Sequence, residues 1–300
     1  MGIQQMLLAG GPPGTVTGQV EWDNDTTLDY TTTWTVPTGV EKISVLCIGR
    51  GGQATQYQGG GGGGLTYANS IVVTEGETLN IRISGGYSAG ATVDGAARWT
   101  WGSRLYKGSL ASPTWAVIAY CGHETAGKSG TSVTVSATSN SGGDAGSYGC
   151  GWGACNYGGA GGAAGYAGVG GDGSIGNATS SNGAGGGSGG GMGTHSSQTH
   201  MNGTGAGGGT GRYGQGSNGS GFAITNPSTD VRGGKRGQGG SNGTPQPGGD
   251  FSGTPGNYGG GNGRIDEYSD DSISKGGKGI VRIIYPGDER YYPTTGTSNQ

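Results

Sequence analysis

Glycine recurs at every third residue in six separate stretches of the chain, and this period restricts the backbone more than any other feature. The stretches start at residues 143, 159, 183, 205, 234 and 253, and the longest one ends at residue 171. A period of three matches the polyproline II helix, which has three residues per turn and no internal hydrogen bonds. Its backbone groups must pair with neighbouring segments, and glycine along one edge allows the necessary close approach. The period therefore predicts a packed bundle of polyglycine II helices.

The alternative interpretation of the glycine-rich region is a disordered low-complexity linker. The chain has 78 glycines among 300 residues, and ordering a glycine costs roughly 0.5–1 kcal/mol more than ordering an alanine. The phase of the repeat holds within each stretch, however, and resets between stretches across non-repetitive loops such as "CGWGACNY" and "THSSQTHMN". This phasing favours an ordered bundle over residues 141–278.

Strand-like sequence fills residues 19–140 and returns once near the end of the chain. Runs such as "TTTWTVPTGVEKISVLCIG", "LTYANSIVVTEGETLNIRISGG" and "TWAVIAY" are rich in Val, Ile, Thr and aromatic residues with frequent alternation. A lone strand at residues 280–285 is not stable by itself, so we expect it to pair with the earlier sheets and to cover an edge strand. The expected fold is all-β, with a β-sandwich of residues 19–140 plus 279–290, an inserted polyglycine II bundle and no significant α-helix.

Two short segments flank this arrangement, residues 1–18 at the start and a tail of residues 291–300. The first contains an apolar cluster that "GGPPG" separates from the strands, formed by Ile3, Met6, Leu7 and Leu8. The cluster predicts an anchoring segment, and a frayed terminus is the alternative.

Charge and cysteine content limit the possible partners. The net charge is −3 with 12% charged residues, so the chain lacks the basic footprint of a nucleic-acid-binding protein. Its apolar runs are too short for membrane insertion. Four cysteines are too few for a disulfide scaffold. Of these, Cys150 and Cys155 could close a small loop, but a reducing cytosol favours free or late-oxidised thiols.

Two glycine motifs resemble nucleotide-binding loops without their required context. "GHETAGKS" at residues 122–129 matches the phosphate-loop pattern, yet "GTSVTVSAT" after it is strand-like and does not begin a helix. "GRGGQA" after "ISVLCI" likewise continues into "TQYQGGGGGG" and not into a helix. We therefore expect no nucleotide cofactor.

Metal-binding and catalytic side chains form no convincing constellation. His195 and His200 flank "SSQT", but their spacing is not diagnostic and a third ligand is missing. The acidic turn "DEYSDD" at residues 266–271 does not have EF-hand spacing, so a calcium site there stays an open alternative to a solvated turn. We expect no metal site, no catalytic residue and no enzymatic activity.

Three segments carry a resemblance to a known family: "WTVPTGVEKISVLCIGRGG", "GGGGGGLTYANSIVVTEGETLNIRISGG" and "GGKGIVRIIYPG". They are similar to the glycine-rich domain of bacteriophage tail-fibre and virion structural proteins. The closing residues "VRIIYPGDERYYPTTGTSNQ" look like the C-terminus of such proteins in T4-like phages of marine hosts. The resemblance covers roughly residues 30–90 and 275–300. More loosely, the glycine-rich region resembles the polyglycine-sandwich tip adhesins of T-even-type phages.

This resemblance implies a virion protein, assembled in the host cytoplasm, that belongs to the tail fibre or tail tip and attaches to the host surface. The implied partners are other phage tail or virion proteins and a host surface glycan or outer-membrane protein. The oligomeric state is left open. The alternative is a structural or decoration protein of the virion that binds no receptor. For the N-terminal apolar cluster, the resemblance implies anchoring in the virion.

Segment direction selects the loops that would contact the host. If the six glycine segments alternate in direction, the loops at residues 150–157, 194–202 and 244–252 lie together at the far tip. Aromatic rings beside amides and imidazoles suit stacking on sugars or capturing a protein loop; the alternative is that these rings plug the open end of the bundle. The candidate receptor-binding residues are Trp152, Tyr157, His195, Gln198, His200, Gln246 and Phe251.

Overall fold

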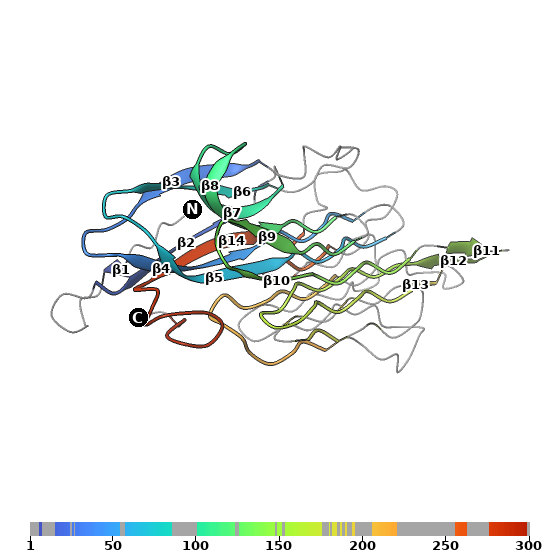
Figure 1. Cartoon of the computed structure of the whole chain (residues 1–300). Helices are drawn as coiled ribbons and strands as arrows, with labels where there is room; N and C mark the ends of the chain where they lie inside the picture. Colours follow the sequence, from blue (N-terminus) through green and yellow to red (C-terminus); the bar gives the residue numbers. More distant parts are fainter. Residues whose placement is uncertain are drawn as a thin grey trace.

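The computed structural model describes an all-β protein, with no helix in the part of the chain that it describes. The described residues are 6–7, 16–24, 26, 28–54, 58–85, 101–123, 126–147, 149–151, 154–175, 180, 182–184, 187, 190, 194–195, 206–220, 256–262 and 276–298. Two large antiparallel sheets occupy one end of the molecule, and glycine-rich segments extend from them to the other end (Figure 1).

The larger sheet has six strands in the order β1-β2-β14-β4-β5-β10. Their bounds are β1 Met6–Leu7, β2 Gly18–Asn24, β14 Gly279–Tyr285, β4 Lys42–Ile48, β5 Leu65–Val72 and β10 Thr138–Asn140. The second sheet has five strands in the order β3-β6-β7-β8-β9. Their bounds are β3 Tyr30–Thr35, β6 Thr78–Ile83, β7 Gly102–Gly108, β8 Pro113–Tyr120 and β9 Gly130–Val133.

The two large sheets lie one above the other (Figure 1), and residues of both form one hydrophobic core. The core residues alternate with more exposed residues along the strands. On β2, Val20 and Trp22 face the core, whereas Glu21 and Asp23, which alternate with them, are only half-buried. The largest contributors from the six-stranded sheet are Trp22, Ile43, Val45, Ile71, Val281, Ile283 and Tyr285, and those from the five-stranded sheet are Trp34, Leu79, Ile81, Ile83, Leu105, Trp115 and Val117.

The returning strand β14 pairs as predicted with the N-terminal part of the chain, but it does not cover an edge. It lies between β2 and β4, antiparallel to both, with Val281 opposite Trp22 on one side and Cys47 on the other. All seven of its residues are buried. A strand that is buried on both faces and paired on both edges belongs in the middle of a sheet, so our prediction of an edge position was wrong.

A second apolar cluster covers the opposite face of the six-stranded sheet. Leu46, Ile48 and Ile284 project from the sheet into this cluster, where they meet Tyr166 and Tyr292. Tyr166 belongs to the glycine-rich region and stacks on Tyr292 at 5.9 Å between ring centroids. The glycine-rich region and the C-terminal segment thus form a layer on the sheet.

Hydrogen bonds between the glycine-rich segments repeat every three residues. The run 58–64 has the most complete pattern, because the consecutive N–H groups of Gly59 to Gly64 donate to four neighbouring segments. Two neighbours recur after three residues: Gly61 and Gly64 donate to residues 123 and 120, and Gly60 and Gly63 donate to residues 262 and 259. Gly59 and Gly62 donate to residues 158 and 143, which belong to two further segments. We call the hydrogen-bonded segments 49–54, 58–64, 120–123, 126–130, 141–147, 158–175, 206–211, 256–262 and 276–279 the glycine array.

The glycine array leaves no space for side chains at most of its glycine positions. A Cβ atom built on Gly62 would lie 2.6 Å from the carbonyl carbon of Gly162 and nearer still to its oxygen. At Gly143, Gly161 and Gly173 the nearest atoms are again carbonyl groups of neighbouring segments. Glycine is therefore needed here for close backbone approach.

The longest glycine stretch makes two passes through the array. Gly165 donates to the carbonyl of Gly168 in a turn, and residues 159 and 162 donate to residues 174 and 171 in antiparallel order. Our count of six alternating segments was therefore wrong at this stretch. The pass from residue 141 to 147 and the pass from 158 to 165 are antiparallel, as expected, because residues 143 and 146 donate to residues 162 and 159.

Candidate functional site

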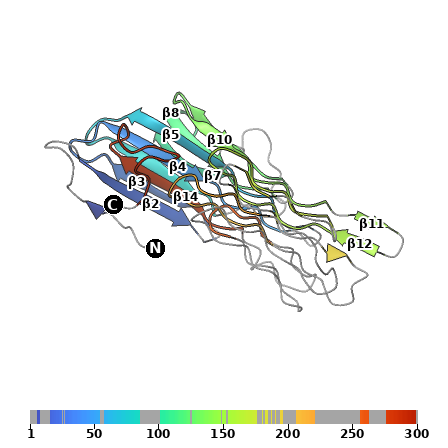
Figure 2. The ribbon, with the colours of Figure 1, turned by 90° about the horizontal axis from the view of Figure 1, so that it is seen from below.

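A small three-stranded sheet lies at the far end of the glycine array from the two large sheets (Figures 1 and 2). It consists of β11 Gly149–Gly151, β12 Ala154–Tyr157 and β13 Thr194–His195. All three strands are antiparallel to their neighbours. Two of the three loops that we expected at the tip, residues 150–157 and 194–202, thus contribute strands to one sheet. We call it the distal sheet.

The register of the distal sheet divides the predicted binding residues between its two faces. Tyr157 is opposite Thr194, and Asn156 is opposite His195. Directly opposite residues share a face, and successive residues alternate between faces. Tyr157 and His195 therefore lie on opposite faces of the distal sheet, although their strands are neighbours.

The other candidate receptor-binding residues lie outside the described part of the chain. These are Trp152, Gln198, His200, Gln246 and Phe251. The acidic turn at residues 266–271 and the loop 244–252 are also outside it. In the sequence, Trp152 and Gly153 stand between β11 and β12.

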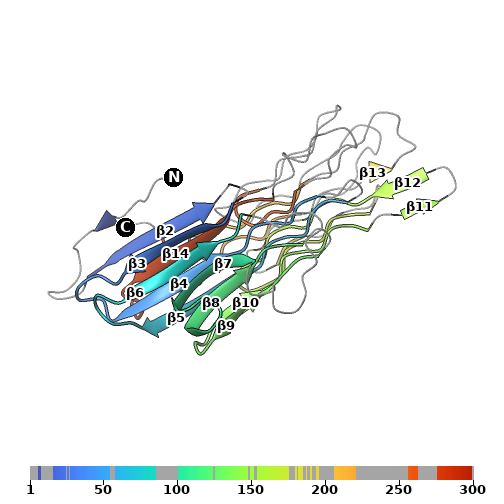
Figure 3. The ribbon, with the colours of Figure 1, turned by 90° about the horizontal axis from the view of Figure 1, so that it is seen from above.

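The predicted anchoring cluster is described only in part. Met6 and Leu7 form β1, which pairs with the start of β2 through Met6 opposite Gln19 and Leu7 opposite Gly18. Ile3 and Leu8 are outside the described residues. β1 lies at the end of the molecule opposite the distal sheet (Figures 1 and 3).

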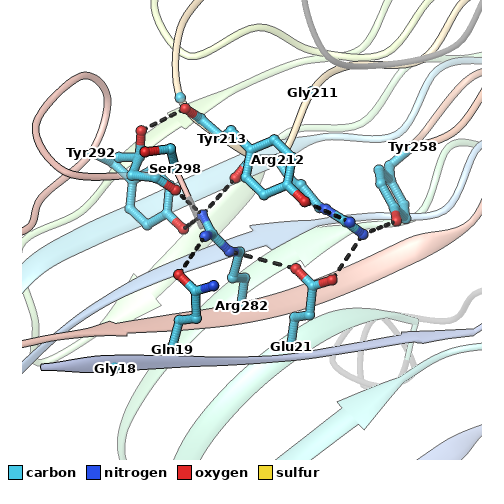
Figure 4. A network of polar contacts seen from close by, with 12 residues as sticks. Gly18, Gln19, Glu21, Gly211, Arg212, Tyr213, Tyr258, Arg282, Tyr292 and Ser298 are labelled. Atoms are coloured by element: carbon cyan, nitrogen blue, oxygen red, sulfur yellow. Dashed lines mark hydrogen bonds and ion pairs between the residues drawn. The ribbon is translucent and has the colours of Figure 1, made fainter. Parts of the chain in front are cut away.

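A buried polar network joins the glycine array to the six-stranded sheet (Figure 4). Arg282, in the middle of β14, is fully buried on the face that the array covers. It donates to the carbonyl oxygen of Arg212 at 3.1 Å, to the Tyr292 hydroxyl at 3.2 Å and to Gln19 Oε1 at 3.2 Å. Its Nε is 3.5 Å from a carboxylate oxygen of Glu21.

Glu21 lies between two arginines of this network. Its other oxygen is 2.9 Å from Arg212, which also donates to the Tyr258 hydroxyl at 2.6 Å. The Tyr213 ring has the Arg212 and Arg282 guanidinium groups each 4.9 Å from its centroid. Burial raises the pKa of Glu21 above its usual 4.5, and this effect outweighs the opposing attraction of the two arginines.

The C-terminal segment closes the network from the other side. Arg290 is 3% exposed and donates to Gln19 Oε1 at 2.9 Å and to the carbonyls of Gly296 and Ser298. Asn69 on β5 and Tyr292 exchange two hydrogen bonds, at 2.7 and 2.9 Å. Residues 291–298 are thus packed onto the sheet. We did not predict this network from the sequence, although a single arginine within the apolar run "GIVRIIY" was a usable signal.

The phosphate-loop match belongs to the glycine array. The strand β9 begins at Gly130, directly after Ser129, so the strand predicted after this motif is confirmed. The Gly122 amide donates to the carbonyl of Arg50, and the Lys128 amide donates to that of Gly62. A phosphate loop needs such amides at a helix N-terminus, whereas here they bind neighbouring backbone.

The two cysteines outside the distal sheet are buried free thiols. Burial raises the pKa of Cys47 to about 12 and that of Cys121 to about 11. Among the described residues, no group of three or more His, Cys, Asp or Glu side chains is placed to hold a metal ion. None of the described segments forms a helix with the length and apolar character needed to cross a membrane.

Comparisons of the chain with models of protein families, with curated proteins and with solved structures found no match.

Proposed function

We propose that this chain is a phage virion protein of the tail fibre or tail tip, which attaches to the host surface through loops at the distal sheet. The observation that carries the proposal is the two-ended architecture. Two sheets with a shared core, β1 and the C-terminal segment occupy one end, and residues 149–157 and 194–195 lie together at the other (Figures 1 and 2). The sequence resemblance to tail-fibre glycine-rich domains supports the same function.

We further propose that the glycine array is a bundle of polyglycine II helices on a β-sandwich. The support is the hydrogen-bond pattern of residues 58–64, where consecutive amides donate to different neighbours and two of these neighbours recur after three residues. That recurrence agrees with three residues per turn. A rod of this kind is stiff because each segment is bonded to several neighbours, so it would hold the distal loops away from the mounting end.

Binding at the tip would use aromatic and polar side chains of the distal loops. Rings present an apolar face to a sugar or to a protein loop, and amide or imidazole groups add directed hydrogen bonds. Since Tyr157 and His195 lie on opposite faces of the distal sheet, they would contact different parts of a receptor. The proposed partners are a host glycan or outer-membrane protein at this end and other virion proteins at the end with β1.

The test measures adsorption of the labelled protein to a panel of marine bacterial strains, with and without competing surface glycan. In an adsorbing strain, the triple variant Trp152→Ala, His195→Ala, Phe251→Ala should weaken binding by at least about 30-fold if one central aromatic anchor is lost. Tyr291→Ala is the matched control, because this tyrosine is 42% exposed and belongs to the C-terminal segment. The control should bind normally.

Two outcomes would contradict the proposal. If the triple variant binds as the wild type does while changes at residues 217–233 abolish binding, the contact surface is elsewhere. The protein could also be incorporated into virions while changes in the distal loops alter neither the adsorption of the purified protein nor that of the virions. A structural role without receptor binding would then be the better explanation.

A further inference from the structure

We propose that Cys150 and Cys155 form a disulfide bond across the β11–β12 hairpin at the tip of the molecule. The two residues are directly opposite each other in the antiparallel register of these strands. The proposal does not depend on what the tip binds.

The register places this pair where a cross-strand disulfide fits. Only Trp152 and Gly153 separate Gly151 from Ala154, so these two outer residues are the first and fourth positions of a two-residue hairpin loop. Such a turn is closed by a hydrogen bond between its first and fourth residues. Since hydrogen-bonded and non-hydrogen-bonded pairs alternate, Cys150 and Cys155 form a non-hydrogen-bonded pair.

Non-hydrogen-bonded pairs bring opposite residues closest together, with Cα atoms about 4.5 Å apart. Disulfides span Cα separations of about 4.4–6.8 Å. Directly opposite residues also share a face of the sheet. The hairpin therefore supplies both the separation and the common face that a disulfide needs.

The same register argues against the main competing use of these cysteines, a zinc site completed by His195. This histidine is opposite Asn156 and so lies on the other face from Cys155. The remaining cysteines do not compete for oxidation, because Cys47 and Cys121 are buried among the residues of the sheets. Thiol–disulfide exchange needs an accessible thiolate, and burial makes the thiols of Cys47 and Cys121 inaccessible.

Oxidation proceeds by exchange with a small disulfide such as oxidised glutathione. One cysteine thiolate attacks a sulfur of the small disulfide and forms a mixed disulfide, releasing one small thiol. The second cysteine thiolate then displaces the other small thiol and closes the Cys150–Cys155 bond. The protein loses two protons and two electrons, and the small disulfide is reduced to two thiols.

Tryptic peptides of the full chain test the proposal without interference from the other cysteines. Residues 129–212 contain no internal Lys or Arg and hold Cys150 and Cys155 alone, while Cys47 and Cys121 fall in other peptides. The folded protein is equilibrated with oxidised glutathione, unfolded, alkylated without reductant and digested. We expect peptide 129–212 to be unlabelled and two hydrogens lighter than its reduced form, and to take two labels after reduction.

Two results of this experiment would overturn the proposal: peptide 129–212 carrying two alkyl labels or glutathione adducts, or disulfide-linked dimers of the chain. A variant in which the second cysteine is moved by one residue serves as the control. The double variant Ala154→Cys, Cys155→Ser moves the second thiol to the position opposite Gly151, on the other face from Cys150. Its equilibrium constant for disulfide formation should fall at least about tenfold because the geometry is strained. Equal formation would show that the register does not determine the bond.

Discussion

The substitution Gly62→Ala tests whether close backbone packing in the glycine array stabilises the protein. Gly62 donates to the carbonyl of Gly143 at 2.9 Å and accepts from the amide of Lys128 at 3.2 Å. An added Cβ would lie 2.6 Å from the Gly162 carbonyl carbon, whereas real Cβ atoms keep at least 3.0 Å from such atoms. The neighbouring segments must separate to admit it.

The size of the effect follows from the hydrogen bonds that such a separation breaks. Gly143 donates to the Gly162 oxygen at 2.8 Å, and a shift of about 1 Å takes a bond of that length beyond the hydrogen-bonding range. Losing two or three buried hydrogen bonds at about 2 kcal/mol each, less about 0.5–1 kcal/mol for the lower entropy of the unfolded alanine chain, gives a net loss of about 3–5 kcal/mol.

Urea denaturation followed by circular dichroism measures this change in the free energy of unfolding. The matched control is Gly76→Asn, because Gly76 has φ +75° in a turn with no atom within 4 Å of an added Cβ, and asparagine tolerates that conformation. The control should lose less than about 1 kcal/mol. If Gly62→Ala is no more destabilising than Gly76→Asn, close packing of the array does not contribute to stability as we argue.

Two further predictions concern the end of the molecule opposite the distal sheet. Because the pKa of folded Glu21 is raised above 4.5, its contribution to stability is fully present below its unfolded pKa and is lost as the pH rises through its folded pKa. Glu21→Gln should remove this part of the pH dependence in urea titrations from about pH 4 to pH 7; an unchanged slope would contradict the assignment. Deleting residues 1–10 should leave a cooperatively folding protein that is not incorporated into virions, as electron microscopy and immunoblotting of particles would reveal, and normal incorporation would refute the anchoring role.

Alternation of apolar residues was sufficient to predict the all-β class and the return of the last strand. It was not sufficient to place that strand, because a period of two indicates which residues share a face but not which strands are neighbours. A stronger signal was present in "GIVRIIY", since a run that is apolar at successive positions is typical of a strand covered on both faces. That signal favours the centre of the sheet over its edge.

The extent of the glycine array was harder to predict. Residues 49–54, 58–64, 120–123 and 126–130 belong to the array, although we assigned them to the sandwich. The continuous run Gly59–Gly64 shows no period of three in the sequence, because every position is glycine. For the candidate site, the period of three and the assumed alternation of segments predicted that the loops 150–157 and 194–202 lie together. The strands β12 and β13, which come from these loops, are indeed paired. The division of Tyr157 and His195 between two faces depends on register, which single-sequence patterns do not specify.

The central position of β14 has a consequence for synthesis of the chain. β2 ends at Asn24 and β14 begins at Gly279, so at about 5–20 residues per second the ribosome needs roughly 13 to 50 s to supply the strand that joins β2 to β4. During that interval the nascent chain carries strands whose shared partner does not yet exist. A product truncated before Gly279 would lack the strand that joins β2 to β4, so the complete six-stranded sheet can form only after β14 has been synthesised.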